Sequence, residues 1–229
     1  MSNMSTNTST GTASDVATVT DCLAIGSIVN SNSHVDYTVE IYTESVRERE
    51  PEVHEYGFGQ PVFVHTRVDG AKHVVMGVIY DTQLINPDQG RTGPRLAQDD
   101  QRQFTPGYVE EQTTFAGIAL LRTAEVAADD SIRAPDQDMP PWTLSVDDTV
   151  LRCPDDITAD FHTDEDGGLR MAYWDRLLSV AGDFGAEVTL AMIDRLRGVF
   201  SGSDSNQRVL DVIEQNVRWQ ASTDRGVVQ

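Results

Sequence analysis

Apolar and polar residues alternate along three consecutive segments in the first half of the chain. The segments are Tyr37 to Tyr42, Phe58 to Val68 and His73 to Leu84, and β-branched and aromatic residues dominate them. Loops that contain glycine, proline or charged residues separate the segments. Alternation with a period of two is typical of half-buried β-strands. Successive strands without helical segments between them predict a small antiparallel barrel.

Other segments complete the predicted barrel. They are Leu23 to Val29, Thr114 to Val126, and Trp142 to Arg152, the last as one strand or a strand pair that closes the barrel. We expect Gly26 to lie at a bulge or at a close approach of two backbones. Asp69-Gly70 is a strong hairpin signal, so the strands on either side of it should pair.

Two polar connections interrupt the strands. The longer one runs from Asn86 to Gln112 and contains several glycines and prolines. A connection of this length is uncommon inside a compact domain and is often functional. The second runs from Ala127 to Pro141. Serine, threonine, asparagine and glycine dominate the N-terminus, so residues 1–20 are expected to form a disordered tail.

The hydrophobic period changes after Cys153. Pro154 to Phe161 predicts a short helix, with proline at its start and acidic residues in its first turn. Three amphipathic helices are expected next, over Leu169 to Gly182, Glu187 to Phe200, and Ser203 to Ala221. The fold class is therefore α+β. A five- or six-stranded barrel spans residues 21–153, with a long loop over 86–113, and a three-helix C-terminal unit lies within residues 154–229.

The chain is strongly acidic. Its 229 residues include 37 acidic and 17 basic ones, which gives a formal net charge of −20. The charge is spread along the chain, so the favoured interpretation is a halophilic protein that stays hydrated in a salt-rich cytoplasm. Direct nucleic-acid binding is not expected, because phosphate contacts need clustered cations. Arg91, Arg95 and Arg102 in the long loop come nearest to a basic patch and are the candidate anion contact.

The sequence shows no sign of membrane insertion or export. No apolar run reaches the ~18 residues that a membrane span needs. No charged segment followed by an apolar stretch marks a signal peptide. Cys22 and Cys153 form neither a disulfide framework nor a zinc ribbon, and small buried apolar roles are favoured for both. We therefore expect a cytoplasmic protein.

The sequence lacks the common catalytic motifs. Lys72 is the single lysine, and Ala71 and His73 flank it, so it cannot belong to a phosphate-binding loop. Neither Gly-x-Gly-x-x-Gly nor Gly-x-Ser-x-Gly occurs in a context that would give it function. We expect no enzyme activity and no cofactor. A hydrolase that assembles His and Asp from distant segments remains a further hypothesis.

Two groups of residues are candidate metal ligands. The segment from His162 to Gly167 resembles the start of an EF-hand loop, but Tyr173 occupies the position of the bidentate glutamate. A solvated acidic loop is favoured there. His65 and His73 flank the Asp69-Gly70 turn and could face each other, but no third ligand is evident. We expect a partly exposed cross-strand pair and no metal site.

Short motifs in the barrel segment suggest a family. They are Ile25-Gly-Ser-Ile-Val, Tyr37-Thr-Val-Glu-Ile-Tyr, Gly57-Phe-Gly-Gln-Pro-Val-Phe-Val and Val75-Met-Gly-Val-Ile. Together they resemble the HAS-barrel, the N-terminal β-barrel of HerA-type DNA-translocating ATPases and of ATP synthase subunits. PRC-type or translation-factor barrels could carry similar motifs. The resemblance covers approximately Leu23 to His162. Helices follow the barrel here instead of an ATPase core, so no catalytic function is implied.

The resemblance implies an adaptor or assembly module. In the family the barrel contributes to ring contacts and to docking of partner proteins. The expected partner is a HerA-like ATPase ring or its nuclease in DNA processing, or an identical subunit in a homo-oligomer. Val217 and Trp219 in the last helix are the candidate interface. The alternative is a small-molecule or anion-binding protein that uses the long loop.

Overall fold

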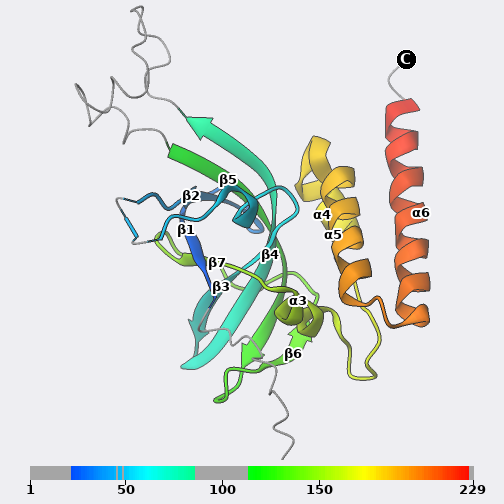
Figure 1. Ribbon diagram of the computed structural model, residues 1–229, viewed down its shortest axis with the longest axis horizontal. Coiled ribbons are helices and arrows are strands. Elements are labelled where there is room, and N and C mark those ends of the chain that lie inside the picture. Colours follow the sequence, from blue (N-terminus) through cyan, green and yellow to red (C-terminus); the bar gives the residue numbers. More distant parts are fainter. Residues whose placement is uncertain (1–21, 45, 48, 86–112, 227–229) are drawn as a thin grey trace, which may run out of the picture.

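Seven antiparallel strands form one sheet, and six of them close into a barrel (Figure 1). The computed structural model describes residues 22–44, 46–47, 49–85 and 113–226. The strands are β1 (Ala24–Ser31), β2 (Asp36–Ile41), β3 (Pro61–Val68), β4 (Ala71–Ile85), β5 (Thr113–Val126), β6 (Ile132–Asp136) and β7 (Thr149–Arg152). Their order is β2-β1-β7-β3-β4-β5-β6, and the additional pairing of β2 with β5 closes the ring. The α+β class and the antiparallel barrel predicted from the sequence are confirmed.

Alternation along the strands separates two cores. Every second residue points into the barrel, and these side chains fill its interior, among them Ile28, Tyr37, Val64, Ile79 and Ile118. Filling by side chains is expected of small barrels. The intervening residues of β3, β4 and β5 form a second core on the outside of the barrel, against the helices. Side chains of the described residues therefore fill the barrel interior.

The predicted hairpin forms at Asp69-Gly70. Both residues have positive φ, 51° and 84°, as the two-residue turn that joins twisted strands requires. The register pairs His65 with Val74 and Thr66 with His73. The two histidines are thus one register step apart and point to opposite faces of the sheet. The predicted His65–His73 pair is wrong, and with it the basis for a shared metal site.

Gly26 lies where two backbones approach closely, as the sequence predicted. The pairing of β1 with β7 shifts register between Ala24 and Gly26. A Cβ atom at Gly26 would lie 2.3 Å from the carbonyl oxygen of Glu40, which no side chain can tolerate. Glycine is therefore required at this position for steric reasons.

Three predicted boundaries are wrong. The connection over Ala127 to Pro141 contains β6, and only the last part of Trp142 to Arg152 is strand, as β7. The helix expected from Leu169 begins at Trp174 instead. Distant polar side chains hold the preceding residues extended: the Asn206 side chain accepts from the backbone N–H of Leu169, and Gln137 donates to the Arg170 carbonyl. These bonds replace the ones that a helical turn would make.

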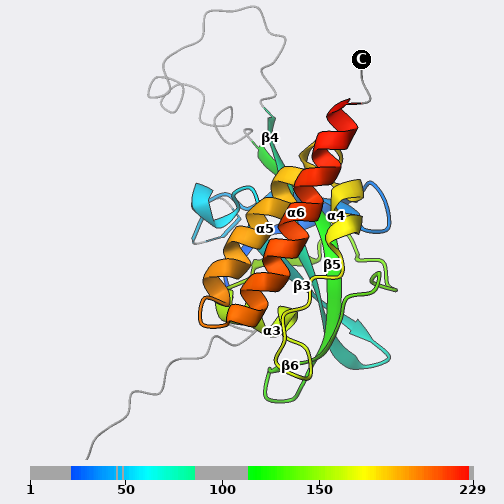
Figure 2. The same ribbon diagram turned by 90° about the vertical axis from the view of Figure 1, so that its right-hand side faces the viewer.

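Helices cover one side of the barrel. They are α3 (Asp155–His162), α4 (Trp174–Val180), α5 (Gly185–Val199) and α6 (Asp204–Gly226), with short 3-10 turns η1 (Val53–Glu55) and η2 (Gly182–Phe184). Figure 2 shows α5 and α6 running side by side in opposite directions. In Figure 1, α6 is the outermost layer, and α5 lies between it and the barrel. The outer face of the barrel and the helices thus share one continuous core.

Several predictions fall outside the described residues. They concern the N-terminal tail and the long loop over residues 86–112, with Arg91, Arg95 and Arg102. Within the described part of the chain, no helix combines the length and the apolar character that crossing a membrane requires.

Candidate functional site

A buried arginine lies between the barrel and the helices. The pairing of β4 with β5 shifts register between Met76, which pairs with Arg122, and Gly77, which pairs with Leu120. Leu121 is the extra residue, and Arg176 of α4 donates a hydrogen bond to its carbonyl. Bulges of this kind re-aim the side chains that follow them. Arg122 therefore shares the helix-facing side of the sheet with Met76, whose side chain belongs to the outer core.

The guanidinium of Arg122 lacks the partners that burial normally demands. Only 1% of the residue is exposed, and its Nε and Nη1 atoms have no hydrogen-bond partner. Its Cζ lies 5.7 Å from the ring centre of Phe161 in α3, a cation–π contact. Among the described residues, no salt bridge includes Arg122. A buried cation without a counter-ion is costly and calls for an explanation.

The pKa of Arg122 reflects the same cost of burial. Burial lowers the pKa of Arg122 from 12.5 to about 10. The charge of Arg170 acts in the same direction, because two nearby guanidinium groups repel each other. Tyr173 and Asp136 act in the opposite direction, but they do not offset the loss of solvent. The nearby charges therefore leave most of the cost of burying Arg122 uncompensated.

Arg122 lines a pocket of about 500 Å³. Pro135 of β6, the loop residues Thr163 to Asp166, and Arg170 form the rest of its wall. The loop carries acidic residues, but the Asp164 carboxylate accepts hydrogen bonds from the backbone N–H groups of Asp166, at 3.0 Å, and Gly168. The Asp164 carboxylate therefore stabilises the conformation of its own loop.

Two guanidinium groups at one pocket favour an anionic ligand. Guanidinium presents planar donors that match carboxylate and phosphate oxygens, often in pairs. An oxyanion in the pocket would supply negative charge beside the Arg122 guanidinium. The acidic loop residues Asp164, Glu165 and Asp166 line the same pocket and act against binding of a long polyanion.

His162 and Tyr173 form a closed pair beside the arginine. The imidazole is fully buried, its Nδ1 lies 2.7 Å from the Thr158 carbonyl, and its Nε2 lies 2.6 Å from the Tyr173 hydroxyl. A carbonyl can only accept, so Nδ1 carries the proton and Nε2 accepts from the tyrosine. Burial, with the charge of Arg122, lowers the pKa of His162 to about 3, and burial raises the pKa of Tyr173. Neither group changes protonation near neutral pH, which argues against an acid–base role. The prediction that His162 belongs to a solvated loop is wrong.

The neutral His162 should make the fold sensitive to acid. Its pKa is lower in the folded chain than the ordinary 6.5, so the unfolded chain binds the proton more readily below that pH. Stability is then lost between pH 6.5 and about 3, and the loss at pH 5 should be about 2 kcal/mol. Urea unfolding at pH 7 and pH 5 should show that the decrease is smaller in His162→Gln than in the native chain. An equal decrease in both chains would mean that carboxylates cause the acid sensitivity.

The other residues singled out in the sequence do not converge on this pocket. His73 contacts Trp142, with ring centres 4.7 Å apart, and His65 contacts Phe63. Cys153 is buried, as predicted, and Cys22 is partly buried. In the part of the chain that the structure describes, no group of three or more His, Cys, Asp or Glu residues is arranged to hold a metal ion.

The two candidate interface residues have different environments. Val217 is fully buried in the outer core, so it is not available to a partner, and that part of the prediction is wrong. Trp219 is 67% exposed. Val209 and Val212 are also exposed, and their helical spacing places them with Trp219 on one flank of α6. Ion pairs of Arg197 with Asp211 and Glu214 occupy the other flank.

Arg122 was not recognised from the sequence. It stands inside the buried run from Ile118 to Ala124, and an arginine among residues of this kind is the signal that could have identified it.

The chain matches a known family model over most of its length. The family model described as "Domain of unknown function (DUF8166)" matches residues 8–228. The chain belongs to this family. The match spans the barrel and the helices together, so the family comprises both parts of the fold. A search of curated proteins finds no match. The family description names no activity.

Proposed function

We propose that this DUF8166 protein is a non-enzymatic binding module that holds a small oxyanion, a phosphate or a carboxylate, against Arg122. The observation that carries the proposal is the fully buried guanidinium, whose Nε and Nη1 lack partners beside an open pocket. Burial of such a group costs stability unless something compensates its charge. Arg170 at the pocket wall supplies a second positive group for the same ligand.

The effect of different anions on thermal stability tests the proposed site. Thermal midpoints should be measured in sodium phosphate, acetate and chloride at constant ionic strength, with titration calorimetry on the anion that raises them. We expect a saturable rise with phosphate or acetate, because a ligand at 100 times its Kd adds about 2.7 kcal/mol. An equal, unsaturated rise in all three salts would indicate screening of the acidic surface and would contradict the site.

A second candidate function rests on α6. The flank that carries Val209, Val212 and Trp219 exposes large apolar side chains on the outermost layer of the fold. Exposed apolar groups that cluster are typical of protein–protein contacts. They support the adaptor role that the resemblance to the HAS-barrel suggests, beside a HerA-like ATPase ring or its nuclease in DNA processing. We also propose that the protein is halophilic and cytoplasmic, and that it acts alone or as a homo-oligomer.

The adaptor role can be tested with purified proteins. The chain should co-elute with a HerA-like ATPase ring in size-exclusion chromatography, and the complex should be lost in Trp219→Asp. Co-elution that Trp219→Asp leaves unchanged would place the contact elsewhere on the chain.

A further inference from the structure

Cys22 and Cys153 lie just beyond the ends of the paired strands β1 and β7. The register pairs Ala24 with Leu151, and the backbone N–H of Arg152 donates to the Leu23 carbonyl at 2.8 Å. One further step along the same ladder places Cys22 opposite Cys153. Because Leu23 and Arg152 form the hydrogen-bonded pair, the cysteines take the next, non-hydrogen-bonded position. Cα atoms in such positions are about 4.5 Å apart, within the range of about 4.4 to 6.8 Å that a disulfide needs.

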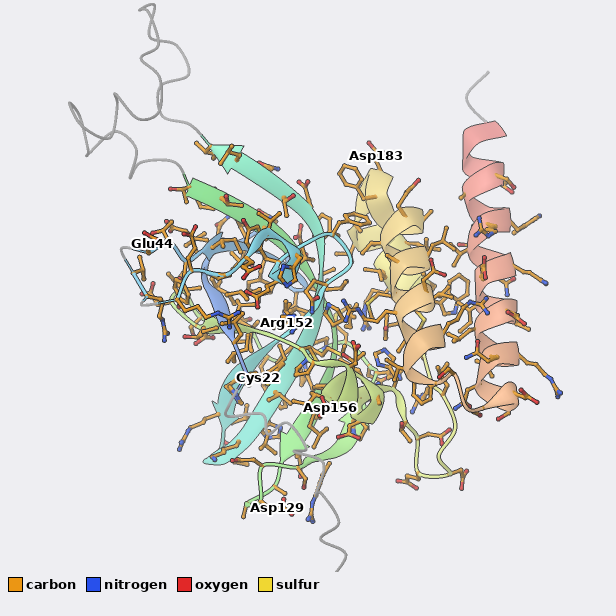
Figure 3. The ribbon with its side chains drawn as sticks, in the orientation of Figure 1. Cys22, Glu44, Asp129, Arg152, Asp156 and Asp183 are labelled. Atoms are coloured by element: carbon orange, nitrogen blue, oxygen red, sulfur yellow. The ribbon has the colours of Figure 1, made fainter. Side chains whose placement is uncertain are left out.

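The two thiols also share one face of the sheet. Directly opposed residues point to the same side, and alternation assigns the cysteines to the side of Ala24 and Leu151. The packing agrees: Cys153 is a member of the outer core, and Cys22 packs against that core. Electrostatic coupling between the two side chains gives a further sign that they are close. Figure 3 labels Cys22 at the start of β1.

We infer that Cys22 and Cys153 form a redox pair that closes a cross-strand disulfide between β1 and β7. Both residues are thiols in the structure. The oxidant would be a low-molecular-weight disulfide. The Cys22 thiolate attacks one of its sulfurs and releases one small thiol, and the Cys153 thiolate then displaces the second. Two protein thiols are oxidised, and one small disulfide is reduced to two thiols. The two protons that the cysteines lose are taken up by these thiols.

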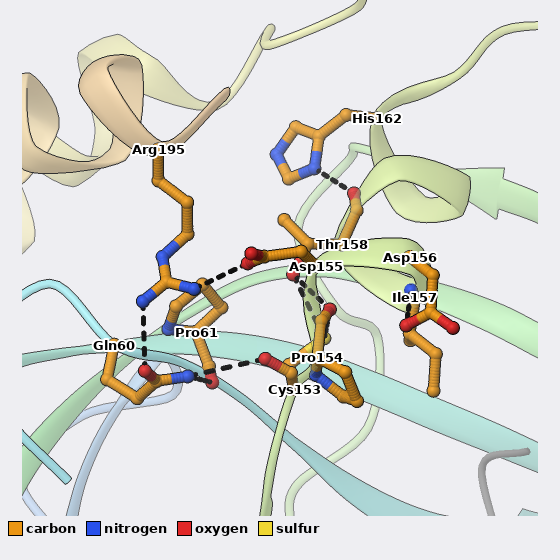
Figure 4. A network of polar contacts seen from close by, with 10 residues as sticks. All are labelled: Gln60, Pro61, Cys153, Pro154, Asp155, Asp156, Ile157, Thr158, His162 and Arg195. Atoms are coloured by element: carbon orange, nitrogen blue, oxygen red, sulfur yellow. Dashed lines mark hydrogen bonds and ion pairs between the residues drawn. The ribbon is translucent and has the colours of Figure 1, made fainter. Parts of the chain in front are cut away.

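Cys22 and Cys153 have different roles in the reaction because their surroundings differ. Cys22 is partly exposed and can meet the oxidant, whereas Cys153 is buried. Figure 4 shows Cys153 just before α3, where the Thr158 hydroxyl donates to its sulfur at 3.4 Å. Burial raises the pKa of Cys153 to about 12, so its thiolate is scarce at neutral pH. Attack by Cys153 is then the slow step, and closure should become faster as the pH rises.

The Cys22–Cys153 disulfide would restrain the first strand of the barrel. It would join the start of β1 to the residue after β7 and would close a loop of about 130 residues. Cross-links over long loops restrict the unfolded chain most, so oxidation should raise the thermal midpoint by about 10 °C. The residues that line the oxyanion pocket include neither cysteine and no residue of β1 or β7.

The test uses the full native chain with oxidised glutathione. After alkylation of remaining thiols, non-reducing peptide mapping should show one peptide pair that joins Cys22 to Cys153 within a monomer. The thermal midpoint should rise by about 10 °C, and a reductant should reverse the rise. The single variants Cys22→Ser and Cys153→Ala should show no linked pair and no shift.

Two results would overturn the inference. One is a chain that, at pH 8 to 9, carries glutathione on Cys22 without forming the internal bond. The other is cross-linking only between two chains. Either would mean that the thiols do not reach bonding geometry within the fold.

Discussion

Arg122→Met should stabilise the protein by about 1 to 3 kcal/mol in anion-poor buffer, a direction that is unusual for a change at a fully buried residue. The drop in the pKa of Arg122 to about 10 corresponds to about 3 kcal/mol lost by the charged folded form. Methionine has a similar length, needs no partner and can pack on Phe161. The lost cation–π contact would offset about 1 kcal/mol or less of the gain. Urea unfolding measures the difference.

The same variant should lose its response to anions. In phosphate or acetate the native chain should gain stability and Arg122→Met should not, so the difference between them should shrink or reverse. Arg133→Met on β6 is the matched control, because Arg133 is exposed and its ion pair with Asp129 is long, at 3.8 Å. It changes the net charge equally and should alter stability by about 0.5 kcal/mol or less. If Arg122→Met were destabilising in every buffer, Arg122 would be a satisfied structural residue, and the anion site would be wrong.

The barrel was predictable because alternation along the chain reports directly on burial. The bounds of β3 and β4 lie close to those of the predicted segments, and the positive φ angles at the hairpin match its Asp-Gly turn. β6 was missed because it contains Pro135 and is polar. Such a strand is tolerated because β6 pairs only with β5, outside the closed ring. Its sequence therefore carries little strand signal.

The pocket was not predictable, because it depends on a register that only the folded sheet defines. By strict alternation, Arg122 would share the interior face with Leu120. The bulge at Leu121 instead turns it towards the helices. The start of α4 likewise depends on Asn206 and Gln137, which are distant in the sequence from the backbone groups that they bind. Features of this kind arise from long-range contacts, whereas periodicity reports only on local ones.

Neighbouring residues of α6 should respond in opposite ways to the same substitution. Val217→Asp places a carboxylate in the core between α5 and α6, where Val217 is fully buried. The lost apolar contacts and the unpaired charge should together cost more than about 4 kcal/mol, enough to unfold much of the protein near 37 °C. Trp219→Asp changes an exposed side chain and should cost about 0.5 kcal/mol or less. Circular dichroism with urea titration separates the two.

The variants Val217→Asp and Trp219→Asp also distinguish a structural role of α6 from a role in binding. Trp219→Asp should keep the native unfolding midpoint and still fail to co-elute with a protein partner, because it places a charge on the apolar flank formed with Val209 and Val212. The charged flank is left intact, since the Glu214 carboxylate keeps its bonds to Arg197 and Arg218. Arg218→Ala is the control for that flank and should retain the complex. If Arg218→Ala abolished co-elution and Trp219→Asp did not, the partner would bind the charged flank, and the apolar flank would not be the docking surface.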